Sequence, residues 1–261
     1  MKGFSEKLHI SSIDENCREL ALKYGMGLEV ASFCWAQMID FELEKNVEAA
    51  RRMTEGIGSL WFHAPFAELA PCAIDPRARK LARTRYRQSA EIARRLGIKR
   101  LVIHGGFIPH VYYPEYYTEQ SVLFWKEFLK EMPEDMTIAL ENVMEPSPDM
   151  LVDIADGVDD PRLGLCLDVG HANTEVSRTP PIEWIGPMAK RLFHVHLHNN
   201  IGGTDLHDHL GNGSIPVEKI IREIMKKCPR ATFTIEDRFA EASLEWLKER
   251  GLLQSILDPE D

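Results

Sequence analysis

Eight short apolar segments recur along the chain, and segments of helical character separate them. Short apolar runs of this kind are typical of buried β-strands. Eight strands that alternate with helices in about 250 residues form the pattern of a (β/α)8 TIM barrel. We therefore predict an α/β fold with a single barrel domain over residues 1–261 and strands at 8–11, 27–33, 59–63, 100–104, 137–142, 163–168, 192–198 and 232–237.

An open, doubly wound sheet is the alternative, but it more often has a glycine-rich loop after its first strand. Here Ser12-Ile13-Asp14-Glu15 has the pattern of a capping box, which predicts a helix from this point to about Gly25. The long basic helix predicted at 76–96 would lie on the outer ring with its charges in solvent. Other helices are predicted at 42–55, before Met132, after Ser147-Pro148, at 216–227 and at 241–250.

The composition constrains location and partners. The hydrophobic content of 44% is ample for a core, and no apolar run approaches the length of a membrane span. Five widely spaced cysteines, without a secretion signal at the start, predict reduced thiols and a cytoplasmic location. A net charge of −10 argues weakly against a nucleic-acid surface, although bound divalent cations would cancel part of it locally.

The seventh apolar segment, 192–199, alternates apolar residues with histidines. Read as a strand, it places His194, His196 and His198 on one face. Buried imidazoles are costly unless something binds them, and Asp205 and His207 follow soon after in the sequence. We interpret this segment as one wall of a metal site.

Six consecutive predicted strands carry a histidine or a carboxylate at or near the carboxyl end, where barrel enzymes place their active sites. One such residue is commonly structural, but six in a row indicate a shared metal site. Imidazole and carboxylate without thiolate favour Zn²⁺, Mn²⁺, Fe²⁺ or Co²⁺. These six residues are His63, His104, Glu141, Asp168, His196 and Glu236.

Three more residues, His171, Asp205 and His207, are placed to face the same mouth. Nine candidate ligands are too many for one ion, and they suit two or three ions bridged by carboxylates.

The same residues lie in short motifs that resemble the xylose-isomerase-like barrel superfamily, over Leu8 to about Arg250. This superfamily includes sugar-phosphate isomerases and epimerases and the endonuclease IV repair enzymes. The motifs are His63-Ala64-Pro65, Val102-Ile103-His104-Gly105, Leu140-Glu141-Asn142, Leu167-Asp168-Val169-Gly170-His171, His196-Leu197-His198-Asn199, Asp205-Leu206-His207, Leu210-Gly211-Asn212-Gly213 and Ile235-Glu236.

The resemblance implies different roles in the two branches. In the isomerase branch, Glu141, Asp168, His196 and Glu236 would hold one Mn²⁺-type ion, the two glutamates would act as acid and base, and His171 would touch a substrate oxygen. In the endonuclease branch, the nine residues would hold three zinc ions. The three sets would be His63, His104 and Glu141; Glu141, Asp168, His196 and Glu236; and His171, Asp205 and His207.

The chain also departs from both branches. Phe66-Ala67 stands where endonuclease IV enzymes insert a Tyr-Leu pair into DNA, and the loop 34–41 has no arginine. Gly202 stands where sugar-phosphate isomerases often have an arginine. This difference favours an unphosphorylated sugar or polyol over a phosphorylated one as the expected substrate.

Three residues are expected to contact substrate: Trp35, Tyr112 and, at the rim, His198. His194 is expected deeper in the barrel. The group of Tyr112, Tyr113, Tyr116 and Tyr117 suits a lid over the mouth and packing against the rim equally well.

The leading hypothesis is a divalent-metal-dependent isomerase or epimerase with one to three Zn²⁺ or Mn²⁺ ions per chain. It would act on a small sugar or polyol, free or phosphorylated, by proton transfer alpha to a carbonyl. The alternative is a trinuclear-zinc phosphodiesterase that acts on abasic DNA, with a non-enzymatic metal-binding module a distant third. A nucleic-acid partner is the less favoured one and no membrane partner is expected, while the sequence leaves the oligomeric state, the native metal and the substrate open.

Overall fold

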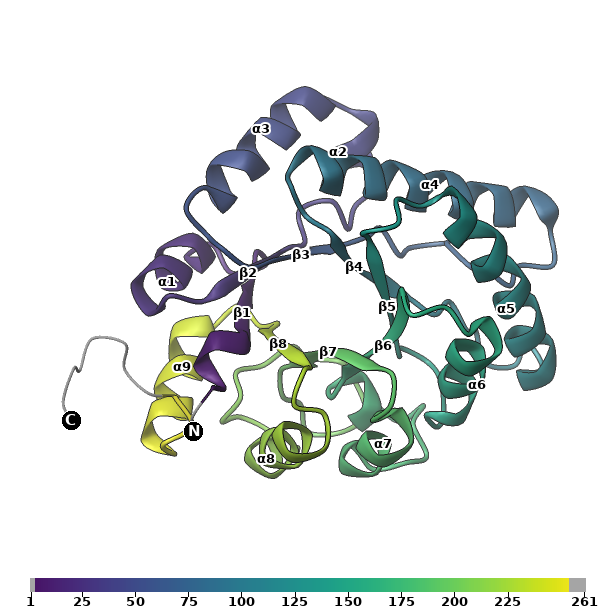
Figure 1. Cartoon of the computed structure of the whole chain (residues 1–261). Coiled ribbons are helices and arrows are strands. Elements are labelled where there is room, and N and C mark those ends of the chain that lie inside the picture. Colours follow the sequence, from purple (N-terminus) through teal and green to yellow (C-terminus); the bar gives the residue numbers. More distant parts are fainter. Residues whose placement is uncertain (1–2, 254–261) are drawn as a thin grey trace.

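The computed structural model describes residues 3–253, which form a closed barrel of eight parallel strands (Figure 1). Each strand pairs with the next, and β8 pairs with β1. The strands are β1 (Leu8–Ser11), β2 (Gly27–Val30), β3 (Leu60–His63), β4 (Arg100–His104), β5 (Thr137–Glu141), β6 (Leu163–Asp168), β7 (Leu192–Leu197) and β8 (Thr232–Ile235). The (β/α)8 prediction is confirmed; its extension over 1–261 includes residues 1–2 and 254–261, which lie outside the described part.

Helices surround this ring of strands (Figure 1). They are α1 (Cys17–Tyr24), α2 (Gln37–Asp40), α3 (Leu43–Thr54), α4 (Pro76–Arg95), α5 (Pro114–Glu131), α6 (Asp149–Val158), α7 (Pro181–Met188), α8 (Val217–Lys227) and α9 (Ala240–Glu249), with short 3-10 turns η1 (Ser5–Lys7) and η2 (His171–Asn173). None of the helices within 3–253 is long and apolar enough to cross a membrane.

The predicted capping box at the first helix is wrong. Helix α1 begins at Cys17, and its first turn has no side-chain cap. The hydroxyl of Ser12 accepts a hydrogen bond from the amide of Ala31 instead, and the carboxylate of Asp14 accepts from the amides of Asn16 and Ala240. These polar residues therefore tie the β1 loop to β2 and α9 rather than start a helix.

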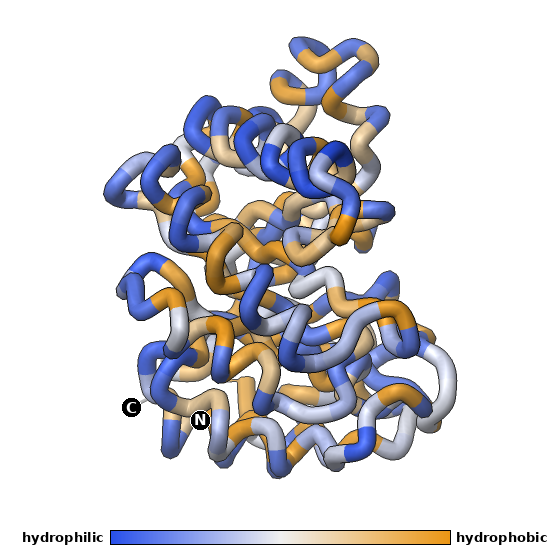
Figure 2. The backbone as a smooth tube through the Cα atoms, turned by 90° about the vertical axis from the view of Figure 1, so that its right-hand side faces the viewer, coloured by the Kyte–Doolittle hydropathy of each residue, from blue (hydrophilic) through white to orange (hydrophobic). Residues whose placement is uncertain are grey.

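The basic helix α4 lies on the outer ring, as predicted. Asp75 caps its start by accepting a hydrogen bond from the amide of Arg77, and Pro76 occupies the first turn. Two of its arginines pair with neighbouring elements, Arg85 with Asp40 of α2 and Arg95 with Glu44 of α3. Figure 2 shows such helices alternating between hydrophilic and hydrophobic residues along their length. The charged residues of α4 thus lie on its outer, solvated face.

The strands alternate between two buried environments. Outward-facing residues such as Val195 pack in the large core between strands and helices. The inward face is unusually polar: His9, Glu29, His194 and Thr234 are all fully buried. The mouth of the barrel continues this polar interior.

Candidate metal centre at the mouth of the barrel

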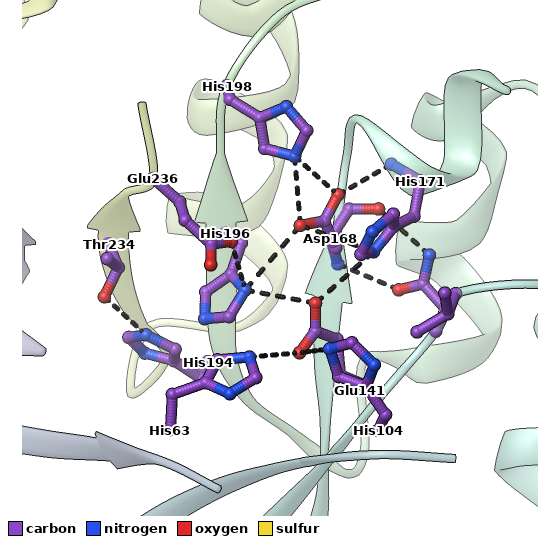
Figure 3. A network of polar contacts seen from close by, with 12 residues as sticks. His63, His104, Glu141, Asp168, His171, His194, His196, His198, Thr234 and Glu236 are labelled. Atoms are coloured by element: carbon purple, nitrogen blue, oxygen red, sulfur yellow. Dashed lines mark hydrogen bonds and ion pairs between the residues drawn. The ribbon is translucent and has the colours of Figure 1, made fainter. Parts of the chain in front are cut away.

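The nine predicted ligands come together at the carboxyl ends of the strands. His63, His104, Glu141 and Asp168 each end a strand, His196 lies one residue before the end of β7, and Glu236 directly follows β8. His171 begins η2, and Asp205 and His207 lie in the loop after β7. Seven of the nine border a cavity of about 970 Å³. The other two, Asp168 and His196, are fully buried beside them. Figure 3 shows most of these side chains converging.

The ligand atoms fall into three groups, each within 4.8 Å, that could hold metal ions: His63, His104 and Glu141; Glu141, Asp168, His196 and Glu236; and His171, Asp205 and His207. These are the three sets that the family resemblance implied. Glu141 belongs to two of them, as a bridging carboxylate would. Two further groups of this kind are Glu29, His63 and His196, and His198, His207 and Glu236.

The central group contains more acceptors than its donor can satisfy. Nδ1 of His196 lies 2.8 Å from Glu236 Oε2, 3.2 Å from Glu141 Oε1 and 3.6 Å from Asp168 Oδ2. One ring nitrogen carries at most one proton. Within the described chain, the buried Oε2 of Glu236 makes no hydrogen bond, so that its contact with His196 is an ion pair only. Three carboxylates around one imidazole nitrogen are a donor set that fits a divalent cation.

The other two groups flank it. Oε2 of Glu141 lies 3.2 Å from Nε2 of His63 and 3.4 Å from Nε2 of His104. On the opposite side, Oδ2 of Asp205 lies 3.3 Å from Nε2 of His171 and 2.8 Å from Nε2 of His207. Nδ1 of His171 turns back to within 3.3 Å of Glu141, so that the three groups are contiguous.

Protons occupy this cluster when no metal is present. Burial alone would lower the pKa of His171, but Asp168, Asp205 and Glu141 raise it well above its ordinary value. Asp205 likewise outweighs the burial of His207 and raises its pKa to about 9. Burial would raise the pKa of Glu141, but His104 and His196 hold it well below its ordinary value. A divalent cation would replace these protons on the imidazoles.

His104 differs from its neighbours. Burial lowers its pKa to about 3, and the nearby Glu141 only partly offsets this. Its ring stacks on Phe66, with ring centroids 4.5 Å apart. A neutral imidazole already has the lone pair that a metal ligand needs.

Two of the three predicted substrate contacts line the cavity, and the third is fully buried. Trp35, which is 61% exposed, and Tyr112 both line the cavity. The rim position predicted for His198 is wrong: the ring is fully buried, its Nε2 lies 3.0 Å from Asp168, and it stacks on His207 at 4.0 Å. Gly170 makes room for this ring, because a Cβ there would meet it at 1.8 Å.

One member of the tyrosine group packs against the rim, and the lid role of the others stays a prediction. Tyr117 is fully buried and donates a hydrogen bond to Glu145, so that it packs the rim. Tyr112 stacks on Tyr116, with ring centroids 6.2 Å apart, and Tyr113 is exposed. Helix α5 begins at Pro114, so that Tyr116 and Tyr117 lie in its first turn.

Sequence reasoning missed Glu29 and Cys34. Glu29 is fully buried on β2 and contacts both His194 and His196. The signal was a charged residue in the middle of an apolar strand, Gly27-Leu28-Glu29-Val30. Sγ of Cys34 lies 3.2 Å from Nδ1 of His63, and no pattern around Cys34 indicated this contact. His194, expected deeper in the barrel, does lie below His196.

A closed parallel barrel with buried histidine and carboxylate groups at its carboxyl mouth is a TIM barrel with a candidate site for divalent metal ions. The chain belongs to the xylose isomerase-like TIM barrel family, whose model matches residues 15–250.

Comparisons with known proteins agree with this assignment. An uncharacterized protein of Methanocaldococcus jannaschii is 31% identical over 200 residues, which cover 72% of this chain and 68% of the relative. A probable endonuclease 4 of Mycobacterium marinum is 22% identical over 227 residues, which cover 83% of this chain and 86% of the relative.

Solved structures with the same fold include a D-tagatose 3-epimerase-like protein, with a TM-score of 0.76, 24% identity and coverage of 93% of this chain and 96% of the other. The TTHB071 protein of Thermus thermophilus, soaked with ZnCl2, has a TM-score of 0.74, 28% identity and coverage of 93% of this chain and 97% of the other.

Proposed function

We propose that this protein is a divalent-metal-dependent isomerase or epimerase that acts on a small sugar or polyol by proton transfer alpha to a carbonyl. The observation that carries the proposal is the group of Glu141, Asp168, His196 and Glu236, of which the two glutamates also border the cavity. The D-tagatose 3-epimerase-like structure of the same fold supports the choice of substrate class.

The proposed division of labour between the two glutamates follows from their contacts. When bound, a Zn²⁺ or Mn²⁺ ion would polarise adjacent hydroxyl and carbonyl oxygens of the substrate. Glu141 lies against His63, His104, His171 and His196, which leaves its oxygens little freedom to accept another proton. Oε2 of Glu236 forms its one ion pair within the described chain with His196, at 2.8 Å, and makes no hydrogen bond there. Glu236 is therefore the better placed base, and Glu141 chiefly holds the centre.

The cavity wall favours an unphosphorylated substrate. Among the described residues that line it, Arg238 is the one arginine and there is no lysine. Trp35 and Phe66 offer aromatic surface on one side, with ring centroids 6.5 Å apart. Aromatic faces suit the C–H surface of a sugar, whereas a phosphate group needs several fixed donors.

Solvent-hydrogen exchange tests the proposal. Protein loaded with Mn²⁺ or Zn²⁺ is incubated in D2O with a panel of ketoses, and deuterium at the alpha carbon is measured by NMR. We expect incorporation with at least one ketose and a loss of more than about 100-fold in Glu236→Gln with metal content retained, because general bases contribute about 10²- to 10⁴-fold. Absence of exchange across the panel in fully loaded protein would overturn the proposal.

A second candidate is a trinuclear-zinc phosphodiesterase. The groups around His63 and around Asp205 favour it, because a single-ion isomerase does not require them. The similarity to a probable endonuclease 4 supports the same candidate. Zinc-dependent incision of a duplex with one abasic site would establish it, and an uncut duplex at low salt with three zinc ions per chain would exclude it.

A further inference from the structure

A single buried carboxylate lies directly beneath the central ligand group. Glu29, on β2, is fully buried inside the barrel. Its Oε1 lies 3.1 Å from Nε2 of His196. Its Oε2 lies 3.0 Å from Nε2 of His194 and accepts a 2.6 Å hydrogen bond from the hydroxyl of Thr234. None of the predicted ligand sets includes this residue.

The two nitrogens of His196 therefore face different groups. Nδ1 points to Glu141, Asp168 and Glu236, and Nε2 points to Glu29. An imidazole that binds a metal through one nitrogen usually donates its other N–H to a carboxylate or carbonyl, which fixes the tautomer and the ring orientation. We propose that Glu29 is a positioning residue that keeps Nε2 of His196 protonated and leaves the Nδ1 lone pair for the metal. This inference rests on the metal binding assumed in the proposed function.

A chain of hydrogen bonds fixes Glu29 from below. The indole N–H of Trp61 donates to the hydroxyl of Thr232, which lies 2.7 Å from Nδ1 of His194. If that hydroxyl donates to Nδ1, Nε2 of His194 carries the proton and faces Glu29 and Thr234, at 3.0 and 2.7 Å. Glu29 thus receives donors from three sides, as a fully buried carboxylate requires.

The same contacts argue against a role for Glu29 as a metal ligand. Glu29, His63 and His196 do form one of the groups that could hold an ion. However, Oε1 faces His196, and Oε2 already contacts both His194 and Thr234. An ion at this place would have to displace donors that satisfy a buried charge, which is costly.

Metal affinity of the full-length protein tests the proposal. We compare wild type, Glu29→Gln and Glu145→Gln by competition for Zn²⁺ with a chromophoric chelator and by the visible spectrum of bound Co²⁺. Glu145 is a matched control, since it is also a buried carboxylate but contacts Tyr117 rather than the ligand groups. Glu29→Gln should weaken Zn²⁺ binding about 10- to 100-fold and alter the Co²⁺ spectrum, whereas Glu145→Gln should leave both unchanged.

The outcomes separate the two hypotheses. Wild type that binds neither Zn²⁺ nor Co²⁺ would overturn the proposed function together with this inference. Wild-type binding with an unchanged affinity and spectrum in Glu29→Gln would overturn the inference alone. If Glu29→Gln fails to fold, Thr234→Val decides, because it removes one donor to Glu29 and keeps the side-chain shape. A severalfold loss of Zn²⁺ affinity in Thr234→Val supports the inference, and an unchanged affinity overturns it.

Discussion

Two sets of buried histidines occupy this barrel, one at its floor and one at its mouth. At the floor, Nδ1 of His9 lies 3.0 Å from the carbonyl of Phe233, and its Nε2 lies 2.8 Å from the hydroxyl of Ser59. Burial lowers the pKa of His9 to about 3 and that of His194 to about 4. At the mouth, Cys34 and Glu141 raise the pKa of His63, and Cys166 and Glu236 raise that of His196. Carboxylates raise the pKa of His171 and His207, whereas burial keeps that of His104 at about 3.

The difference lies in what surrounds each ring. A carbonyl and a hydroxyl satisfy a neutral imidazole, so that His9 is complete as it stands. Gly27 belongs to the same arrangement, because a Cβ there would meet the His9 ring at 2.2 Å. At the mouth, three carboxylates face the single Nδ1 of His196, which carries at most one proton, and a cation can complete this cluster. Histidine content alone therefore does not locate a metal site; several carboxylates around one imidazole nitrogen do.

The largest expected effect comes from the carboxylate shared by two mouth groups. Saturating Zn²⁺, at about 1,000 times Kd, should stabilise wild type by about 4 kcal/mol. Glu141→Gln should lose most of this, because Glu141 belongs to two of the three ligand groups. Thermal unfolding with and without Zn²⁺, together with elemental analysis, measures both effects.

Glu145→Gln serves as the control and should keep the full response to zinc. Wild-type zinc content and zinc stabilisation in Glu141→Gln would contradict the assignment of the mouth as the metal centre. The mouth histidines, like the floor histidines, would then not be metal ligands.

The sequence predicted which side chains gather, but not how they divide. The carboxyl ends of parallel strands meet at one edge, so that the ends of β3 to β8 alone brought six of the nine residues together. The division into three groups depends on loop geometry. His207, for example, has a positive φ of 47°, which its sequence gives no reason to expect.

The sequence also did not predict which single side chains are buried inside the barrel. His198 follows β7 and looked like a rim residue, but it turns inward to Asp168 over the space left by Gly170. Glu29 was hidden for the opposite reason, since its partners His194 and Thr234 lie far away in sequence. The local signal, a charged residue within an apolar strand, does not identify partners that lie across the barrel interior.

The floor histidine should make the protein sensitive to acid. The folded-state pKa of His9 is about 3, below the ordinary 6.5, so that between these values the unfolded chain binds a proton that the folded protein excludes. This contribution to stability is present above pH 6.5 and falls by up to about 1.4 kcal/mol per pH unit as the pH decreases towards 3.

His9→Asn should be less stable than wild type at pH 7, with a gap that narrows as the pH falls to 4. Urea unfolding of metal-free protein over this range measures the gap. Ser59→Ala, which removes the hydroxyl partner of His9 but no titrating group, should keep the wild-type slope. Parallel curves for wild type and His9→Asn would show that His9 is not excluded from protonation.

The smallest effect, of opposite sign, is expected from His207. Its folded-state pKa is about 9, chiefly because contact with Asp205 outweighs its burial. In metal-free protein its contribution to stability is therefore fully present below pH 6.5 and is lost as the pH rises through about 9. His207 is partly exposed, which limits the contribution to about 1 kcal/mol or less.

His207→Gln should flatten the decline in stability between pH 7 and 9, as measured by urea unfolding. Lys45→Gln, which breaks only an exposed ion pair with Glu42, should leave this decline unchanged. With Zn²⁺ present the wild-type trend should reverse, since the ion competes with these protons and binds more tightly as they leave. A wild-type decline that persists unchanged in His207→Gln would mean that Asp205 does not hold a proton on this ring, and the mouth would then resemble the floor at this position.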